Sequence, residues 1–454
     1  MTLIAARGET LGLQVFHRDA GPTTLRIADA SHVTVQAFAV DQHVVRRAST
    51  DLYGGSQGTG RYPDGLTPTT APTTNPAYFE LAIARDATPG TRDGELVIAG
   101  RTFPVTLTIA PLTLPPPRLD VWAYEDPREL GWANGVPGQP PRANAGAPTA
   151  IEQRCIAMFR ERGVLLSPDM TVDAYAARKD LLTGFPYVPA IIPDDPAKAG
   201  DAVRAWITAT AGSGQLPFAI PIDEPRTPEA RQKVRALADA VRAAGGGPRS
   251  FLFAVTDEPR PEYGDRIDLY IQWNAAHLAG DPHLRWTYNG RPPRAGAMVL
   301  DAATPGTRTW GWIAWRWNIP VWYVWDALYW HDRHNRRAMP LPGRALDPSV
   351  DSVSFDDGDD HGNFDGVLAL PIAGGCQRTL RLASIRRGLQ DRALLELANK
   401  CNPAATAKLA AELVPTALGD APADGKPSWP TDEAAWERAR RTLIELASSA
   451  ACSR

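Results

Sequence analysis

The feature that most constrains the fold is a change of pattern after Leu119, where strand-like apolar runs begin to alternate with helical runs. The alternation continues for about 250 residues, which is typical of a parallel α/β architecture and suits the length of a (β/α)8 TIM-type barrel. We therefore expect a barrel over residues 116–378. Its strand-like runs include residues 119–124, 217–222, 251–256, 284–288, 321–325 and 367–370, and its helical runs include residues 151–162, 197–210, 228–244, 266–279 and 308–317.

Different patterns flank this region on both sides. Residues 10–111 consist of short runs in which apolar and polar residues alternate, separated by Gly, Pro and Asp, which predicts a β-sandwich over residues 1–115. A proline-rich linker, residues 112–119, follows. At the other end, residues 379–454 are expected to form a C-terminal helical region packed on the barrel, with helices at residues 381–398, 403–414 and 432–450. The predicted fold class is α/β with an all-β N-terminal domain.

Composition excludes several classes of partner. The 48 Lys and Arg residues against 51 Asp and Glu residues give a net charge of −3, so no basic stripe for a nucleic acid is expected. No run approaches the ~20 apolar residues of a membrane-spanning helix. The four cysteines are far apart and show no metal-ligand spacing, so we expect no metal, no other cofactor and at most two disulfides.

The start of the sequence shows no basic stretch followed by a long apolar core, so no signal peptide is visible. Because the first residues already form a strand-like pattern, we expect a secreted or periplasmic protein whose export signal lies outside this sequence. A cytoplasmic location is the alternative. The oligomeric state is not predicted by any feature of the sequence.

A repeated tetrapeptide is the clearest candidate for chemistry. Asp223-Glu-Pro-Arg226 follows one predicted strand, and Asp257-Glu-Pro-Arg260 follows the next, 34 residues later. That distance is one βα unit, so both acid pairs are expected at the carboxyl ends of neighbouring parallel strands, where barrel active sites are built. Side chains alternate along a strand, so the two acids of a pair should point in different directions. The structural alternative is a turn that begins a helix, because acids and proline favour the first helical turn.

Tryptophan is concentrated in one part of the chain. Half of the 14 tryptophans lie between Trp310 and Trp330. Indole rings stack on the apolar faces of sugars, so tryptophans at strand ends beside acids suggest a carbohydrate site. We expect Trp312 and Trp315 to be packing residues of a helix, and Trp325 and Trp330 to line a pocket.

The acidic run from Asp356 to Asp365 matches a calcium-binding loop only in part. His361 stands where the EF-hand template has Asp or Asn, and Leu368 stands where it has the bidentate Glu. We therefore expect a loop that faces solvent or substrate.

Several segments together resemble bacterial proteins with a DUF4091-type C-terminal region, which are related to glycoside hydrolase family 123. Residues 6–14 resemble the opening strand of that family's N-terminal sandwich, and residues 255–259 match its Asp-Glu-Pro motif. The remaining matching segments follow in the family's order and are residues 62–68, 87–91, 308–317, 321–325, 365–371 and 381–391.

The resemblance implies a β-sandwich followed by a (β/α)8 barrel that cleaves β-linked N-acetylgalactosamine or a similar 2-acetamido sugar from a glycan or glycoconjugate. It also implies retaining, substrate-assisted catalysis, in which the substrate's own acetamido oxygen attacks the anomeric carbon. Asp257 would orient and polarise the acetamido group. Glu258 would protonate the leaving oxygen and later deprotonate water, for which its pKa would be raised by burial against tryptophan walls. The expected substrate-binding residues are Tyr124, Asp223, Glu224, Tyr288, Asn289, Trp325, Asp326, Trp330 and Asp365.

Residues 368–373 depart from the family's usual ending, which leaves two alternatives open. The first is a carbohydrate-binding protein without catalysis on a hydrolase scaffold. The second is a glycosidase for a different sugar, with Glu258 as the acid and a separate carboxylate as the nucleophile.

Overall fold

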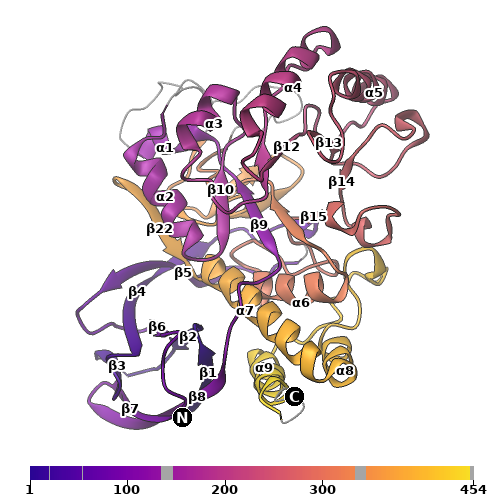
Figure 1. Ribbon diagram of the computed structural model, residues 1–454. Helices are drawn as coiled ribbons and strands as arrows, with labels where there is room; N and C mark the ends of the chain where they lie inside the picture. Colours follow the sequence, from indigo (N-terminus) through magenta and orange to yellow (C-terminus); the bar gives the residue numbers. More distant parts are fainter. Residues whose placement is uncertain (20, 54, 134–146, 333–343, 450–454) are drawn as a thin grey trace.

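The computed structural model describes residues 1–454 except residues 20, 54, 134–146, 333–343 and 450–454 (Figure 1). Its architecture confirms the expected fold class, with N-terminal β-sheets, an eight-stranded parallel barrel covered by helices, and C-terminal helices. No helix of the described residues is long and apolar enough to cross a membrane.

The barrel is made of short parallel strands. They are β9 (Asp120–Tyr124), β10 (Val164–Ser167), β11 (Tyr187–Pro189), β12 (Leu216–Ala219), β13 (Leu252–Val255), β14 (Leu269–Ile271), β15 (Arg285–Tyr288) and β16 (Val321–Val324). Apart from β10 and β11, neighbours in the chain pair with each other, and β16 pairs with β9. A bridge between Met170 and Ala190, just beyond β10 and β11, brings the last two strands together.

Helices cover the outside of the barrel and start where local chemistry predicts. The helices between barrel strands are α1 (Pro127–Ala133), α2 (Ala150–Arg160), α3 (Val172–Arg178), α4 (Pro196–Thr210), α5 (Pro228–Ala243) and α6 (Thr309–Arg316). The first turns of α2, α3, α4 and α5 are capped by Thr149, Thr171, Asp195 and Thr227, which accept backbone N–H groups. Proline stands at the first position of α4 and α5, where no N–H is needed.

The strand connections on either side of β14 contain short 3-10 turns in place of α-helices. These turns are η2 (Pro261–Tyr263), η3 (Ala275–His277) and η4 (Pro282–Leu284). The prediction of a helix over residues 266–279 is therefore wrong. Buried Leu269 and Ile271 alternate with half-buried Tyr270 as in a strand, and Gly264 and Gly280, both at positive φ, bound the segment.

Two sheets form the N-terminal sandwich and enclose a core to which both contribute. One sheet has the order β1-β8-β7-β3 and the other the order β2-β6-β4-β5-β22-β21. The strands are β1 (Thr2–Arg7), β2 (Thr10–Val15), β3 (Thr23–Ile27), β4 (Val33–Val45), β5 (Gly60–Thr69), β6 (Ala77–Ile83), β7 (Gly90–Ile98), β8 (Arg101–Thr113), β21 (Leu370–Ile372) and β22 (Gly375–Thr379).

The strand expected over residues 367–370 is not a barrel strand. Only Leu370 belongs to a strand, β21, which pairs antiparallel with β22, and β22 pairs with β5 of the sandwich. A disulfide between Cys155 of α2 and Cys376 of β22 links this extended sheet to the helical layer of the barrel. The small remaining strands are β17 (His331–Asp332), β18 (Arg344–Ala345), β19 (Val353–Asp356) and β20 (His361–Asn363).

The C-terminal region is helical, as expected, in α7 (Leu380–Cys401), α8 (Pro403–Leu413) and α9 (Glu433–Ala447). Helix α7 contacts β5 and β2 of the sandwich, α6 of the barrel, and both α8 and α9 (Figure 1). The three parts of the fold thus share α7 as a common packing element.

Candidate active site at the mouth of the barrel

Aromatic rings from strands on different sides of the barrel meet in its interior. Trp122 of β9 lies 5.0 Å from Phe218 of β12 and stacks on Tyr323 of β16 at 4.7 Å between ring centroids. Phe218 also lies 5.0 Å from Trp286 of β15. These contacts identify the inward face of each strand. Residues in register on parallel strands share a face, and side chains alternate, so the pairing gives a direction to the residues near each strand end.

Thr256, just after β13, faces the interior of the barrel. Leu252 is in register with inward-facing Phe218, so alternation places Ala254 and Thr256 on the same side. The Thr256 hydroxyl donates to Asp223 Oδ1 at 2.5 Å and accepts the backbone N–H of Glu224 at 2.8 Å. One hydroxyl therefore joins the end of β13 to both acids of the first repeat.

The first acid pair is held in an unusual backbone conformation. Glu224 has a φ of 40°, a left-handed value that costs roughly 1–3 kcal/mol in a residue other than glycine. Its exposed side chain pairs with exposed Arg226, and such an exposed ion pair contributes only about 0–1 kcal/mol, so Glu224 can exchange this partner for a ligand. Burial raises the pKa of Asp223 above its ordinary value against the opposing effect of the Thr256 hydrogen bond.

Asp169, which the sequence analysis did not identify, joins this site. Ser167 of β10 accepts a hydrogen bond from the inward-facing indole of Trp122 at 2.9 Å, and alternation then turns Asp169 inward as well. Burial, together with the charge of Asp223, raises the pKa of Asp169 to about 7. The apolar run at residues 164–167, which lies between two predicted helices, was the signal for a strand that would have located it.

Two tyrosines complete the cluster. Burial raises the pKa of Tyr288, and the charges of Glu224 and Asp223 add to the rise. Burial also raises the pKa of Tyr323, with further contributions from Asp169 and Asp223. We call this set the mouth cluster; it consists of Asp169, Asp223, Glu224, Thr256, Tyr288 and Tyr323.

An aromatic wall adjoins the mouth cluster. The partly exposed rings of Tyr288 and Trp273 lie 4.8 Å apart at an interplanar angle of 31°. The guanidinium of Arg294 lies 5.9 Å from the Trp273 ring. Trp273 is not among the predicted site residues, because the sequence predicts a helix over residues 266–279, where the structure has β14.

The second acid pair lies at the neighbouring strand end, as the 34-residue spacing predicts, but Asp257 faces away from the interior. Arg260 Nη2 lies 3.1 Å from Asp257 Oδ1, the Tyr263 hydroxyl donates to Oδ2 at 2.7 Å, and Arg231 of α5 lies 3.9 Å from Oδ2. Burial alone would raise the pKa of Asp257, but the hydrogen bonds from Arg260 and Tyr263 hold it below its ordinary value. Asp257 is thus an ionised anchor between β13, α5 and η2.

Glu258 is exposed and accepts a hydrogen bond from Asn274 Nδ2 at 3.1 Å. The expected burial against tryptophan walls is absent at this residue, because the chain has left β13 at Val255 and runs along the surface at Glu258 and Pro259. The alternative that the acid pairs begin helices is also wrong. Helix α5 begins at Pro228, after its own cap at Thr227, and the second pair precedes only the short turn η2.

Trp325, directly after β16, is partly exposed and is held from several sides. Its ring packs against Tyr329 at 5.0 Å, and it donates a hydrogen bond to buried Asp365, whose pKa burial raises to about 7. A Cβ at Gly366, which has a φ of 67°, would lie 2.6 Å from Trp325 Cζ2, so glycine is required for this ring position. Trp325 and Asp365 thus form a supported aromatic wall, with Asp365 behind the ring.

Trp330 does not line a pocket. Its side chain is 1% exposed, and its indole N–H donates to the backbone carbonyl of Ala369 at 2.8 Å. The hydrophobic layer outside the barrel encloses it, as it does Trp310, Trp312 and Trp322. The packing role expected for Trp312 is confirmed.

Three further predicted residues support the barrel mouth. Tyr124 is in register with Ser167 and faces inward. Asp326 is 1% exposed, and its Oδ1 accepts the backbone N–H of Leu328 at 2.9 Å. Asn289 Oδ1 accepts the backbone N–H of Trp325 at 2.9 Å, which ties the end of β15 to the end of β16.

The acidic run at residues 356–365 connects β19 to β20 and includes β20. Part of it packs on the sandwich. His361 Nε2 lies 2.6 Å from the backbone carbonyl of Ala48, so this histidine faces protein. Within the described parts of the chain, no group of three or more His, Cys, Asp or Glu side chains is arranged to hold a metal ion.

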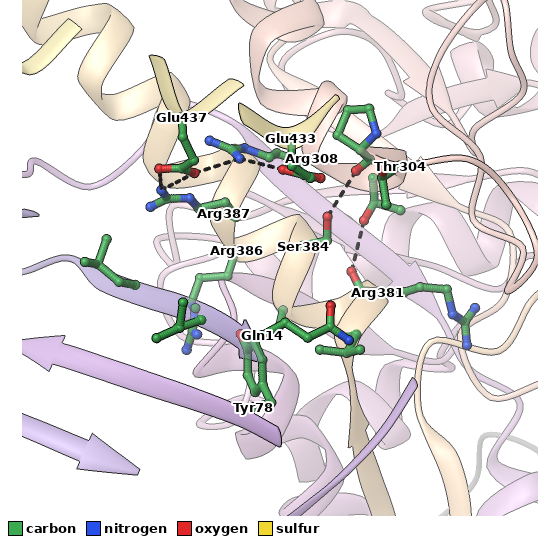
Figure 2. A pocket seen from close by; sticks show the side chains of 18 of the residues that line it. Gln14, Tyr78, Thr304, Arg308, Arg381, Ser384, Arg386, Arg387, Glu433 and Glu437 are labelled. Carbon is green, nitrogen blue, oxygen red and sulfur yellow. Dashed lines mark hydrogen bonds and ion pairs between the residues drawn. The ribbon is translucent and has the colours of Figure 1, made fainter. Parts of the chain in front are cut away.

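A cavity of about 810 Å³ lies elsewhere, between the sandwich, the segment before α6, and helices α7 and α9 (Figure 2). We call it the seam cavity. Two of its arginines are paired with carboxylates: Arg308 with Glu433 and Glu437 at 3.1 and 2.9 Å, and Arg387 with Glu437 at 2.7 Å. Arg381, in the same wall, pairs with Asp64 at 2.8 Å. The seam cavity shares no residue with the mouth cluster.

Comparison with solved structures places this fold. A family 123 glycoside hydrolase from Clostridium perfringens, described in work on glycolipid glycan hydrolysis, matches with a TM-score of 0.66. The match covers 98% of this chain and 94% of that chain at 11% sequence identity, so the likeness concerns the fold.

Two family 2 glycosyl hydrolases from Bacteroides cellulosilyticus align over 74% and 71% of this chain and 47% and 42% of theirs. Their identities are 9% and 10% and their TM-scores are 0.27 and 0.28, which is below the similarity of a shared fold. Comparisons of the sequence with family models and with curated proteins found no match. The chain therefore has a glycoside hydrolase-like fold that resembles family 123.

Proposed function

We propose that this protein is a retaining glycoside hydrolase that releases a β-linked 2-acetamido sugar, such as N-acetylgalactosamine, from a glycan or glycoconjugate. The observation that carries the proposal is the barrel mouth, where adjacent Asp–Glu pairs follow β12 and β13 beside partly exposed aromatic rings. The near-full-length likeness in fold to a family 123 hydrolase supports it, and that relative's link to glycolipid glycans points to conjugates as the substrate class.

The proposed reaction has two steps. In the first, the carbonyl oxygen of the substrate's 2-acetamido group bonds to the anomeric carbon while the bond to the leaving oxygen breaks, and a glutamic acid protonates that oxygen. An aspartate accepts the acetamido N–H and stabilises the positive charge of the cyclic intermediate. In the second step water attacks the anomeric carbon, the same glutamate removes its proton, and the acetamido group is restored with retained configuration.

The sharpest test compares matched substrates that differ only at the 2-position. We expect turnover of 4-nitrophenyl β-N-acetylgalactosaminide, or of its gluco epimer, to exceed that of the 2-hydroxy galactoside or glucoside by at least a hundredfold. NMR of the first-formed sugar should show the β-anomer. A thiazoline of the same sugar, which imitates the cyclic intermediate, should inhibit competitively.

Other outcomes would replace the proposal. Equal turnover of the acetamido and hydroxy substrates would indicate a different sugar and a carboxylate nucleophile. Binding on a glycan array with no hydrolysis of any aryl glycoside would indicate a carbohydrate-binding protein on a hydrolase scaffold.

The disulfide supports the secreted or periplasmic location that we propose. Such bonds persist in oxidising compartments and are rare in the cytosol. The Cys155–Cys376 bond closes a loop of 221 residues, and removing a cross-link over so long a loop costs on the order of 4–5 kcal/mol. We expect the C155S/C376S variant to unfold at clearly lower denaturant concentration than the oxidised protein. Equal stability of the two would remove this support.

A further inference from the structure

We propose that Asp223 and Glu224, and not Asp257 and Glu258, are the catalytic pair of the barrel. This inference rests on the proposed function and deepens it by assigning the reaction to one of two identical sequence motifs. The two motifs cannot be distinguished by their residues, since both are Asp-Glu-Pro-Arg after a barrel strand. They are distinguished by the contacts that each pair makes in the folded chain.

The first argument is geometric. The site of a barrel enzyme lies over the carboxyl ends of its strands, where inward-facing side chains converge. Thr256 faces this space and binds both Asp223, through its hydroxyl proton, and Glu224, through its lone pair. Asp257, the next residue, takes no part in this contact and instead accepts the hydroxyl of Tyr263, which is fully buried.

The second argument concerns availability. Asp257 already has three partners that satisfy its carboxylate: Arg260, Tyr263 and Arg231. A carboxylate so bound has little capacity left for a substrate amide. Asp223 has the Thr256 hydroxyl as its side-chain donor, which leaves its second oxygen, Oδ2, to accept the acetamido N–H.

The third argument is the neighbourhood. Tyr288 and Tyr323 are in register on β15 and β16 and share the inward face, and the charge of Asp223 raises the pKa of both. The Tyr288 ring lies 4.8 Å from that of Trp273, which provides an apolar wall suited to a sugar face. The left-handed backbone of Glu224 is the kind of strain that active sites retain.

These placements define the roles. Asp223 orients and polarises the acetamido group, and Glu224 gives its proton to the leaving oxygen and later takes one from water. Thr256 is a positioning residue, since it acts through both acids. Asp257 anchors β13 to α5, and Glu258 lies on the rim, where Asn274 holds it.

The test uses four variants of the full-length protein on a 2-acetamido aryl β-glycoside: E224Q, D223N, E258Q and D257N. We expect E224Q and D223N to lower kcat/KM by ~10²–10⁴. The E258Q and D257N variants should lose no more than about tenfold. E229Q, in the exposed first turn of α5, is the matched control, and the melting temperature of each variant shows whether it is folded.

A leaving-group series separates acid catalysis from a structural effect. E224Q should lose much less kcat on a 2,4-dinitrophenyl glycoside, which needs no protonation, than on a 4-methylumbelliferyl glycoside. Azide, which needs no general base, should restore its turnover and give a glycosyl azide.

The outcomes are distinct. If E258Q shows this leaving-group dependence and azide rescue while E224Q behaves like E229Q, the assignment is overturned and the proposed function stands. If the wild-type protein hydrolyses no aryl glycoside, the proposed function itself fails, and the assignment with it.

Discussion

The seam cavity and the mouth cluster are both rich in charged side chains, yet they are organised in opposite ways. In the seam, each of Arg308, Arg381 and Arg387 has a carboxylate within 3.1 Å, and Figure 2 shows the pairs of Arg308 and Arg387 with Glu433 and Glu437. In the mouth, carboxylates gather beside one another, and burial raises the pKa of both Asp169 and Asp223. Paired charges hold parts of a fold together, whereas gathered like charges prepare groups to bind and release protons. Charge density alone therefore does not identify a site.

The largest effect is expected in the seam, at the pair of Arg440 and Glu9, whose side chains are 1% and 0% exposed. Removing one partner of a buried pair costs about 3–5 kcal/mol, and Glu9 would then keep Arg387, at 2.7 Å, as its one arginine among the described residues. We expect R440M to lower the free energy of unfolding by this amount in urea titrations followed by tryptophan fluorescence. The double variant E9L/R440M should recover much of the loss. An R440M variant as stable as the wild type would contradict the structural role of the pair.

In the mouth cluster, removing a charged side chain should raise the free energy of unfolding at high pH, whereas in the seam it lowers it. The pKa of Asp169 is about 7 in the folded protein against an ordinary value of 3.8, so its ionisation opposes folding as the pH rises from about 4 to 7. D169N removes this penalty and should raise the free energy of unfolding at pH 8 by roughly 4 kcal/mol. At pH 4 the variant and the wild type should be equally stable. A gain that does not depend on pH would have another cause.

Thr256 tests the mouth without changing any charge. T256V removes the hydroxyl that binds Asp223 and Glu224 and keeps the shape of the side chain. We expect kcat to fall about tenfold, which corresponds to ~1.4 kcal/mol, with a smaller change in KM. T256S keeps the hydroxyl and should restore most of the rate. Equal rates for T256V and T256S would exclude the positioning role.

The smallest effect concerns Glu437 in the seam, whose side chain is 48% exposed. Burial alone would raise the pKa of Glu437, but Arg387, Arg308 and Arg440 hold it well below its ordinary value of 4.5. Its contribution to stability is present above that ordinary value and is lost as the pH falls further. E437Q should thus destabilise by ~0.5–1 kcal/mol at pH 7 and by progressively less as the pH falls below 4.5. The same pH difference in E445Q, on exposed helix surface, would show that the effect is not specific to the seam.

The sequence predicts the architecture well because its signals are local. Alternation of apolar residues, capping residues such as Thr227 and the spacing of the acid repeats depend on neighbours within one element. Strand β14 was missed because Leu269–Ile271 is only three residues long, too short for its period to be distinguished from that of a helix.

The candidate site is predicted only as a list of residues near one edge, because direction is a long-range property. Whether Asp257 faces in or out depends on Leu252 lying beside Phe218, across a βα unit. The burial of Trp330 depends on Ala369, 39 residues later. Spacing along the chain contains neither fact, and the two acid repeats are separated only by contacts between strands, such as that of Thr256 with Asp223.

The Glu9–Arg440 pair also affects the order in which parts of the fold can form during synthesis. The two residues are 431 positions apart, so a ribosome delivers Glu9 long before its partner exists. Arg387, the other arginine that contacts Glu9, also lies 378 positions after it. During synthesis the first strands therefore carry a carboxylate that cannot yet be buried at low cost. The contacts of Glu9 with α7 and α9 can form only after Arg387 and Arg440 have been made, although the first strands of the sandwich are made long before.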